Sequence, residues 1–130
     1  MDGQPTTDLE AVRSLAVAYC EAIHRSKPDV FERMCHENFL MTALSGSGAP
    51  VFWDKAAYLE RVSSRDPFAG EPSYEILSID VSGDAIAHVK LWIDVPPRRF
   101  EDYLGFFRAG GEWRLITKLF RTADGPALEG

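Results

Sequence analysis

The chain has 130 residues and a formal net charge of −6, from 14 Lys and Arg against 20 Asp and Glu. This length fits a single domain with a full hydrophobic core. The acidic balance, without any cluster of Lys and Arg, argues against nucleic acid as a partner. No stretch approaches the roughly 20 apolar residues of a membrane span. Residues 1–5 lack the basic start and apolar run of a signal peptide, so we expect a cytoplasmic protein.

The first predicted element is a helix from residue 8 to about residue 25. Thr7 and Glu10 have the spacing of a capping box, in which the threonine oxygen accepts from the backbone and the glutamate reaches back. One apolar stripe recurs every three or four positions, at Leu9, Val12, Leu15, Ala16, Tyr19 and Ile23. Residues 1–6, before the helix, are expected to form a loose arm.

Shorter elements follow as far as residue 72. Pro28 suits the first position of a second helix, which we expect over about residues 29–36. Residues 39–44 form a short apolar run that predicts a strand, and residues 45–50 predict a loop. Asp54 suits the cap of a third helix that ends near Arg61, and residues 67–72 are expected to be a linker. Cys20 and Cys35 are expected to be small buried groups rather than a disulfide.

The second half of the chain predicts a meander of four antiparallel strands. The strands are expected over residues 73–81, 84–95, 99–108 and 112–121. Ser82-Gly83 has the composition of a tight hairpin turn, Pro96-Pro97 interrupts a strand, and Ala109-Gly110-Gly111 forms a turn. Three helices followed by such a sheet define an α+β fold. We expect one domain over residues 1–130, ordered from about 7 to 122, with a loose tail over residues 123–130.

Both faces of the predicted sheet are half apolar, because side chains alternate along a strand. In the strand over 84–95, one face carries Ala85, Ala87, Val89, Leu91 and Ile93, and the other carries Ile86, His88, Lys90, Trp92 and Asp94. Two half-apolar faces need two covers, so we predict helices on one face and the partner of a homodimer on the other. A monomer with some exposed apolar side chains is the alternative.

Four segments carry a resemblance to a known superfamily. They are residues 12–19, Ile79-Asp80-Val81-Ser82-Gly83-Asp84-Ala85, Phe100-Glu101-Asp102-Tyr103-Leu104, and residues 111–120. In order and spacing, these segments resemble the cone-shaped α+β proteins related to nuclear transport factor 2, ketosteroid isomerase and the polyketide cyclases. The likeness covers about residues 8–121 and is closest to the small bacterial lumazine-binding branch.

The resemblance implies a curled sheet whose concave face encloses a pocket together with the first and third helices. It also implies dimerisation through the outer face of the sheet. The implied inward positions are Ile86, His88, Lys90, Trp92, Glu101, Tyr103, Gly105, Phe107, Ile116, Lys118 and Phe120. Tyr19 falls where the isomerase keeps its oxyanion tyrosine, and Tyr103 falls where it keeps a protonated aspartate. The position of its general base falls near Ala43 or Leu44, neither of which can take a proton.

Several of these residues have both a functional and a structural interpretation. Tyr19 and Tyr103 could both donate to one ligand oxygen, or could simply be core tyrosines. His88 could act as an acid or a base, or lie at a wet sheet face. Lys118 needs a carboxylate, for which we expect Glu101, and the pair either selects a ligand or is purely structural. The histidines are too scattered for a metal site, and no cofactor is expected.

Three functions remain open at this point. The first is a homodimeric protein that binds a small, partly apolar molecule, with aromatic walls from Tyr19, Trp92, Phe107 and Phe120. The second is an isomerase, dehydratase or cyclase that uses His88 as the base with Tyr19 and Tyr103. The third is a dimerisation module with a filled interior.

Overall fold

The computed structural model describes residues 7–129, and the predicted arm over residues 1–6 lies outside them. Three helices precede or interrupt the sheet: α1 (Asp8–Arg25), α2 (Pro28–Met34) and α3 (Lys55–Ser63). Thr7 caps α1 by accepting from the Glu10 amide at 3.1 Å, and Asp54 caps α3 by accepting from Ala57, as predicted. Within the described part of the chain, no helix has the length and apolar character needed to cross a membrane.

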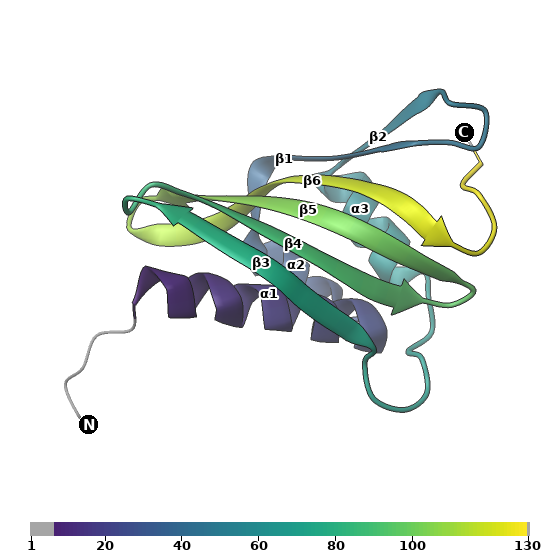
Figure 1. Cartoon of the computed structure of the whole chain (residues 1–130), viewed down its shortest axis with the longest axis horizontal. Helices are drawn as coiled ribbons and strands as arrows, with labels where there is room; N and C mark the ends of the chain where they lie inside the picture. Colours follow the sequence, from purple (N-terminus) through teal and green to yellow (C-terminus); the bar gives the residue numbers. More distant parts are fainter. Residues whose placement is uncertain (1–6, 130) are drawn as a thin grey trace.

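Six strands form one mixed sheet (Figure 1). They are β1 (Cys35–Leu44), β2 (Pro50–Asp54), β3 (Tyr74–Ser82), β4 (Ile86–Val95), β5 (Arg98–Ala109) and β6 (Glu112–Asp124). The order across the sheet is β2-β1-β6-β5-β4-β3. The four-stranded meander is confirmed. The expectation of a wholly antiparallel sheet is wrong in one place, because β1 runs parallel to β6. Strand β2 was not predicted, and only its first residue, Pro50, fell in the expected loop.

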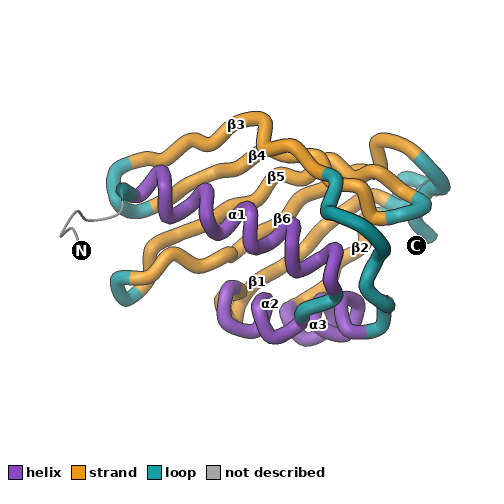
Figure 2. Tube along the Cα trace, turned by 90° about the horizontal axis from the view of Figure 1, so that it is seen from below, coloured by secondary structure: helices purple, strands orange, loops and turns teal. Residues whose placement is uncertain are grey.

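The helices cover one face of the sheet, and we call this the inner face (Figure 2). The fold is therefore the predicted α+β arrangement of three helices on a curled sheet. The core between the layers is built from aliphatic and aromatic side chains of both. The strands contribute Val89, Leu91, Ile93, Leu104, Phe106 and Leu115, and the helices contribute Val12, Tyr19, Phe31 and Val62.

The register decides which side chains point inward, and it corrects the sequence prediction for β4 and β5. Leu91 pairs with Asp102 on the inner face, while Lys90 pairs with Tyr103 on the outer face. The inward residues predicted for β4 and β5 are offset by one position from the inward residues observed. Such an offset moves every side chain to the other face of the sheet. The aliphatic row of β4, which gains most from burial, faces the helices. The polar and aromatic row with His88 and Trp92 faces away.

A bulge in β6 turns its second half inward. Gly105 pairs with Thr117 but Phe106 pairs with Leu115, so Ile116 is an extra residue in the ladder. Such an insertion lets Leu115 and Lys118 point to the same face, although they are three residues apart. The inward placement of Lys118 and Phe120 is thus confirmed, and both are buried.

The C-terminal segment differs from the predicted loose tail. After β6, the chain crosses the end of the sheet towards the turn between β1 and β2 (Figure 1). Arg98 Nε donates to the Pro126 carbonyl at 2.8 Å, and the Gly46 amide donates to the Leu128 carbonyl at 2.8 Å. Leu128 is 7% exposed and belongs to the hydrophobic core. This one apolar side chain, which shows no periodicity, anchors the segment.

Candidate functional site

Four polar side chains meet inside the core on the inner face. Tyr19 comes from α1, Tyr58 from α3, Asp102 from β5 and Lys118 from β6. All four are buried, and Tyr19 and Asp102 are completely inaccessible to solvent. The strand register explains the meeting, since Leu104 pairs with Lys118 and Asp102 pairs with Phe120 on neighbouring strands. We call these four residues the inner polar cluster.

The hydrogen bonds of the inner polar cluster centre on one carboxyl oxygen. Tyr19 Oη donates to Asp102 Oδ2 at 2.5 Å, and Lys118 Nζ lies 3.9 Å from the same oxygen. Lys118 Nζ also donates to Tyr58 Oη at 3.5 Å. The other oxygen, Asp102 Oδ1, is buried and has no hydrogen-bond partner among residues 7–129. Because a buried polar atom is almost always paired, this oxygen is an exception among the buried polar atoms of the cluster.

Aromatic rings surround the lysine of the cluster. Lys118 Nζ lies 5.1 Å from the ring centroid of Tyr19, 5.0 Å from that of Tyr58 and 4.8 Å from that of Phe120. The negative faces of these rings stabilise an ammonium group that burial would otherwise penalise. Phe31 packs edge-on against both Tyr19 and Tyr58, which holds the two tyrosines in place. Aromatic side chains therefore enclose the cluster.

Burial shifts the protonation of every member of the cluster towards the neutral form. It raises the pKa of Asp102, an effect that the Lys118 charge and the Tyr19 hydrogen bond partly offset. It lowers the pKa of Lys118 to about 8, partly offset by Asp102. It also raises the pKa values of Tyr19 and Tyr58 well above that of a free tyrosine. Both hydroxyls therefore stay protonated and can donate hydrogen bonds.

The predicted site residues divide between the two faces of the sheet. Tyr19, Lys118 and Phe120 lie on the inner face as predicted. Those placed on the outer face, against the prediction, are Ile86, His88, Lys90, Trp92, Glu101 and Tyr103. Alternation along β4 and β5 is the reason, because the intervening residues are the buried ones.

Tyr103 is 43% exposed and lies on the opposite side of the sheet from Tyr19. Its ring centroid is 5.4 Å from that of His88, and Lys90 Nζ lies 5.7 Å from it. Because these groups sit on the outer face, His88, Tyr19 and Tyr103 cannot share one active site. The partner expected for Lys118 was also wrong: Glu101 pairs with Arg121 on the outer face at 2.9 Å, and Asp102 faces the lysine.

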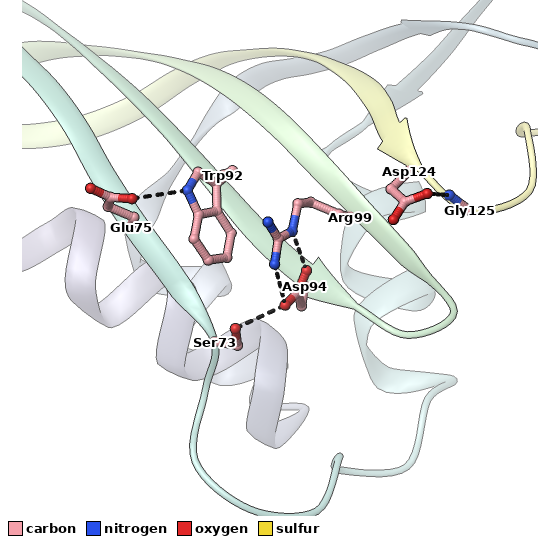
Figure 3. A network of polar contacts seen from close by, with 7 residues as sticks. All are labelled: Ser73, Glu75, Trp92, Asp94, Arg99, Asp124 and Gly125. Carbon is pink, nitrogen blue, oxygen red and sulfur yellow. Dashed lines mark hydrogen bonds and ion pairs between the residues drawn. The ribbon is translucent and has the colours of Figure 1, made fainter.

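Trp92 belongs to a polar network on the outer face (Figure 3). Its Nε1 donates to Glu75 at 3.2 Å, and the Arg99 guanidinium lies 3.8 Å from its ring centroid. Arg99 forms two hydrogen bonds with Asp94, which also accepts from Ser73. These contacts tie the ends of β3, β4 and β5 together. Trp92 is therefore part of a surface network and not a wall of the inner polar cluster.

The last two predicted residues lie away from the cluster. The ring of Phe107 packs edge-on against His36 with centroids 5.1 Å apart, on the outer side of β5 and β1. Ile116 occupies the bulge of β6. Within residues 7–129, no three His, Cys, Asp or Glu side chains form a group able to hold a metal ion.

Two members of the cluster were not among the predicted site residues. Asp102 alternates with Phe100, Leu104 and Phe106, so it shares their face of the strand. A charged residue on an otherwise apolar face is the signal that could have revealed it. Tyr58 lies in α3, a helix in which the sequence predicted no functional residue. Its contact with Lys118 depends on how α3 packs on β1, which periodicity does not show.

The outer face is hollowed beside Tyr103. A groove of about 320 Å³ is lined by Thr42, Ala43, Leu44, Glu101, Tyr103, Leu119, Phe120 and Arg121. A second hollow of about 320 Å³ lies beside His88 and Gly105. Tyr19 and Asp102 line neither of these hollows. The outer groove is apolar and open, whereas the inner polar cluster is enclosed.

Solved structures similar to this one define its class. A nuclear transport factor 2-like protein of unknown function from Silicibacter pomeroyi is 23% identical, with a TM-score of 0.79 over 86% of this chain and 92% of that one. One from Shewanella baltica is 15% identical, with a TM-score of 0.83 over 93% and 100%. A ketosteroid isomerase-like protein from Erwinia carotovora is 13% identical, with a TM-score of 0.70 over 93% and 100%. At these identities the likeness shows the fold alone, which is nuclear transport factor 2-like.

The family is narrower than the fold. Residues 7–121 match the family described as "Putative lumazine-binding", and the chain belongs to that family. A search of curated proteins found no match. The predicted resemblance is therefore confirmed at the level of both fold and family.

Proposed function

We propose that this protein binds a small, partly apolar molecule between the helices and the inner face of the sheet. The inner polar cluster would anchor the polar end of that molecule, and Phe31 and Phe120 would contact its apolar part. The observation that carries this proposal is the unpaired, fully buried Asp102 Oδ1.

An unpaired buried oxygen costs about 1–3 kcal/mol, so a partner that completes it contributes to affinity. Burial raises the pKa of Asp102, so its neutral form is easier to reach than that of an exposed aspartic acid, and in that form Oδ1 could donate to a carbonyl oxygen. Tyr19 or Lys118 could donate to the same oxygen. The arrangement therefore suits a ligand with a carbonyl group. The family's description names lumazine, a bicyclic dione, which makes it the first compound to test.

The test is a titration of the protein with lumazine, followed by ligand fluorescence, together with native mass spectrometry of freshly purified protein to detect a retained molecule. We expect Asp102→Leu and Tyr19→Phe to weaken binding about tenfold, the loss of one hydrogen bond to a buried group. Tyr103→Phe is the matched control on the outer face and should bind as the parent does. Neither bound lumazine nor a retained molecule, or equal affinity in all variants, would contradict the proposal.

We also propose that the outer face of the sheet joins two copies of the chain. A row of paired residues crosses four strands there: Phe52, Thr42, Leu119 and Tyr103. Leu40 and Leu44 flank this row, and all of these except Thr42 are large and exposed. A contiguous apolar patch on a sheet face is typical of an interface.

Sedimentation velocity tests this assembly. Leu119→Arg should convert a dimer to a monomer, because the new charge would be buried against the partner. Leu9→Lys is the control, since Leu9 is as exposed but lies on α1. A monomeric parent protein would rule the interface out.

The expected compartment, the cytoplasm, is part of the same proposal. Cys20 and Cys35 are free and buried, which is compatible with a reducing environment. Cell fractionation with an antibody to the protein tests this placement.

A further inference from the structure

The groove beside Tyr103 on the outer face has room for one large side chain. It encloses about 320 Å³ over β1, β6 and β5. Thr42, Leu119 and Tyr103, one from each of these strands, form a single row of paired residues across it. This volume is at the lower limit for a ligand pocket, which is about 300 Å³. The groove is therefore suited to a compact occupant.

The charged residues that line this groove neutralise each other. Arg121 Nε donates to Glu101 Oε1 at 2.9 Å, and the two residues form an ion pair at the edge of the groove. The other lining residues within 7–129 are uncharged. A charged occupant would thus lose its hydration without gaining a free counter-charge, whereas an apolar occupant would not. The electrostatics of the groove match an apolar side chain.

Phe52 is an apolar side chain of suitable size close to the groove. It lies on β2, is 59% exposed and pairs with Thr42. In the sheet order, β2 is followed by β1 and then by β6, so Phe52 lies two strands, about 10 Å, from Leu119. Phe52 is not among the residues that line the groove of its own chain. One patch of the outer face thus carries both a projecting ring and a hollow.

The hairpin that carries Phe52 is held in place by the C-terminal segment. The Gly46 amide, in the turn between β1 and β2, donates to the Leu128 carbonyl at 2.8 Å. A Cβ atom on Gly46 would lie 2.9 Å from the Ala127 Cβ atom, so the glycine allows the segment to pack closely on the turn. Because the hairpin is anchored before any partner arrives, Phe52 loses little conformational freedom on binding.

We propose that, in the dimer, Phe52 of each copy inserts into the outer-face groove of the other copy. This inference rests on the proposed assembly and adds its geometry. A twofold interface uses the same patch on both copies, so one contact of ring and groove generates the second. The symmetry axis then lies midway between β2 and β6, over β1 at Thr42.

The insertion would cover the most exposed apolar side chains of the patch. Leu44 and Leu119 line the groove and are largely exposed in the single chain. Against the inserted ring of Phe52, both would lose contact with water, which favours association. An aromatic anchor in a pocket is also the usual centre of a stable interface.

Phe52→Ala tests the insertion by sedimentation velocity at several protein concentrations. We expect the dissociation constant of the dimer to rise about thirtyfold or more, the effect of truncating an anchor residue. Leu77→Ala is the matched control, because Leu77 is also a large exposed apolar residue but lies on β3, at the opposite edge of the sheet. This control should assemble as the parent does. Both side chains are exposed, so either truncation leaves a folded chain.

Thr42→Cys tests the position of the symmetry axis. A residue at a twofold axis faces its own counterpart, and a disulfide needs Cα atoms within about 7 Å. We therefore expect a covalent dimer on mild oxidation, seen by electrophoresis without reducing agent. Ser82→Cys, exposed on β3 and four strands from β1, should remain uncrosslinked. The native Cys20 and Cys35 are buried in both variants.

The outcomes separate this geometry from the assembly itself. A dimer that survives Phe52→Ala unchanged, or that Thr42→Cys does not crosslink, would overturn the insertion and leave the proposed dimer standing. A monomeric parent would overturn both. A monomer that retains an apolar molecule in native mass spectrometry, and loses it in Leu119→Arg, would assign the groove to a ligand instead of a second copy.

Discussion

Asp102 is the residue that connects most of the interior chemistry. Its Oδ2 atom accepts from Tyr19 and faces Lys118, and its Oδ1 atom is unpaired. Because Asp102 is fully buried, its hydrogen bond with Tyr19 and its attraction to Lys118 are stronger than they would be at the surface. The loss of any one partner should therefore be measurable as a change in stability.

The hydroxyl of Tyr19 should contribute strongly to stability, and that of Tyr103 should not. Tyr19→Phe leaves both oxygens of Asp102 without a hydrogen-bond donor inside the core. We expect the free energy of unfolding, measured by urea denaturation, to fall by about 1–3 kcal/mol. Tyr103→Phe removes a hydroxyl from an exposed ring and should change the free energy of unfolding by less than about 0.5 kcal/mol. Equal effects of the two substitutions would contradict the assignment of the two faces.

Lys118 should make stability rise between about pH 8 and about pH 9. Burial lowers its pKa to about 8 in the folded protein, against 10.5 for an ordinary lysine. In this window the unfolded chain still binds the proton that the folded chain releases, so rising pH favours folding. The slope for one proton is at most about 1.4 kcal/mol per pH unit.

The comparison with Lys118→Met isolates this contribution from other groups. Cys20 and Cys35, whose pKa values burial raises, act in the opposite direction, because the unfolded thiols lose protons first. Both proteins contain these cysteines, so the difference between their unfolding free energies reports on Lys118. From about pH 8 to about pH 9, the unfolding free energy of the parent should rise by about 1 kcal/mol relative to that of Lys118→Met. A constant difference would mean that the folded lysine has an ordinary pKa.

At the level of single residues, the sequence predicted part of the inner polar cluster. Tyr19 follows from the apolar stripe of α1, and Lys118 stands out between Ile116 and Phe120. Tyr103 was predicted to point inward, whereas its neighbour Asp102 does so. A resemblance fixes the approximate position along a strand but not the face to which a side chain points. Only the pairing of β5 with its neighbours distinguishes two adjacent residues, and that pairing is a tertiary property.

At the level of elements, the bulge of β6 decides whether the cluster forms. It sits opposite the point where Gly105 pairs with Thr117, and it turns Lys118 and Phe120 inward. Strict alternation from Leu115 would have placed Lys118 on the outer face. The helices and the four strands of the meander were predictable from caps, turns and periodicity. The bulge, strand β2 and the parallel pairing of β1 with β6 depend on contacts between distant segments.

Gly105 should be essential for the close approach of β5 and β6 at this bulge. A Cβ atom added there would lie 2.5 Å from Thr117 Oγ1, well inside contact distance. Gly105→Ala should therefore destabilise the protein by about 1–3 kcal/mol. Adding Thr117→Ala removes the clashing oxygen and should recover about 1 kcal/mol or more, which a double-mutant cycle in urea measures. Independent, additive effects of the two substitutions would show that the strands are not in this contact.

At the level of the whole molecule, the sheet has two faces with different chemistry. The same strands supply both, because Asp102 and Lys118 point inward while their neighbours Tyr103 and Leu119 point outward. The expectation of two covers for the sheet came from this alternation. The helices are one cover, and the second copy of the chain is the other that we propose.

The two faces should respond to substitution separately, and this distinguishes a binding protein from a pure dimerisation module. If the outer face joins two copies, the melting temperature of the parent should rise with protein concentration by mass action. Asp102→Leu should keep this dependence while losing affinity for the ligand, since its side chain is on the inner face. Leu119→Arg should lose the dependence but bind the ligand normally. A thermal denaturation series at several concentrations, combined with the lumazine titration, measures both. Loss of ligand binding in Leu119→Arg would mean that the inner site forms only in the dimer, because the opposite faces of β5 and β6 would then be coupled.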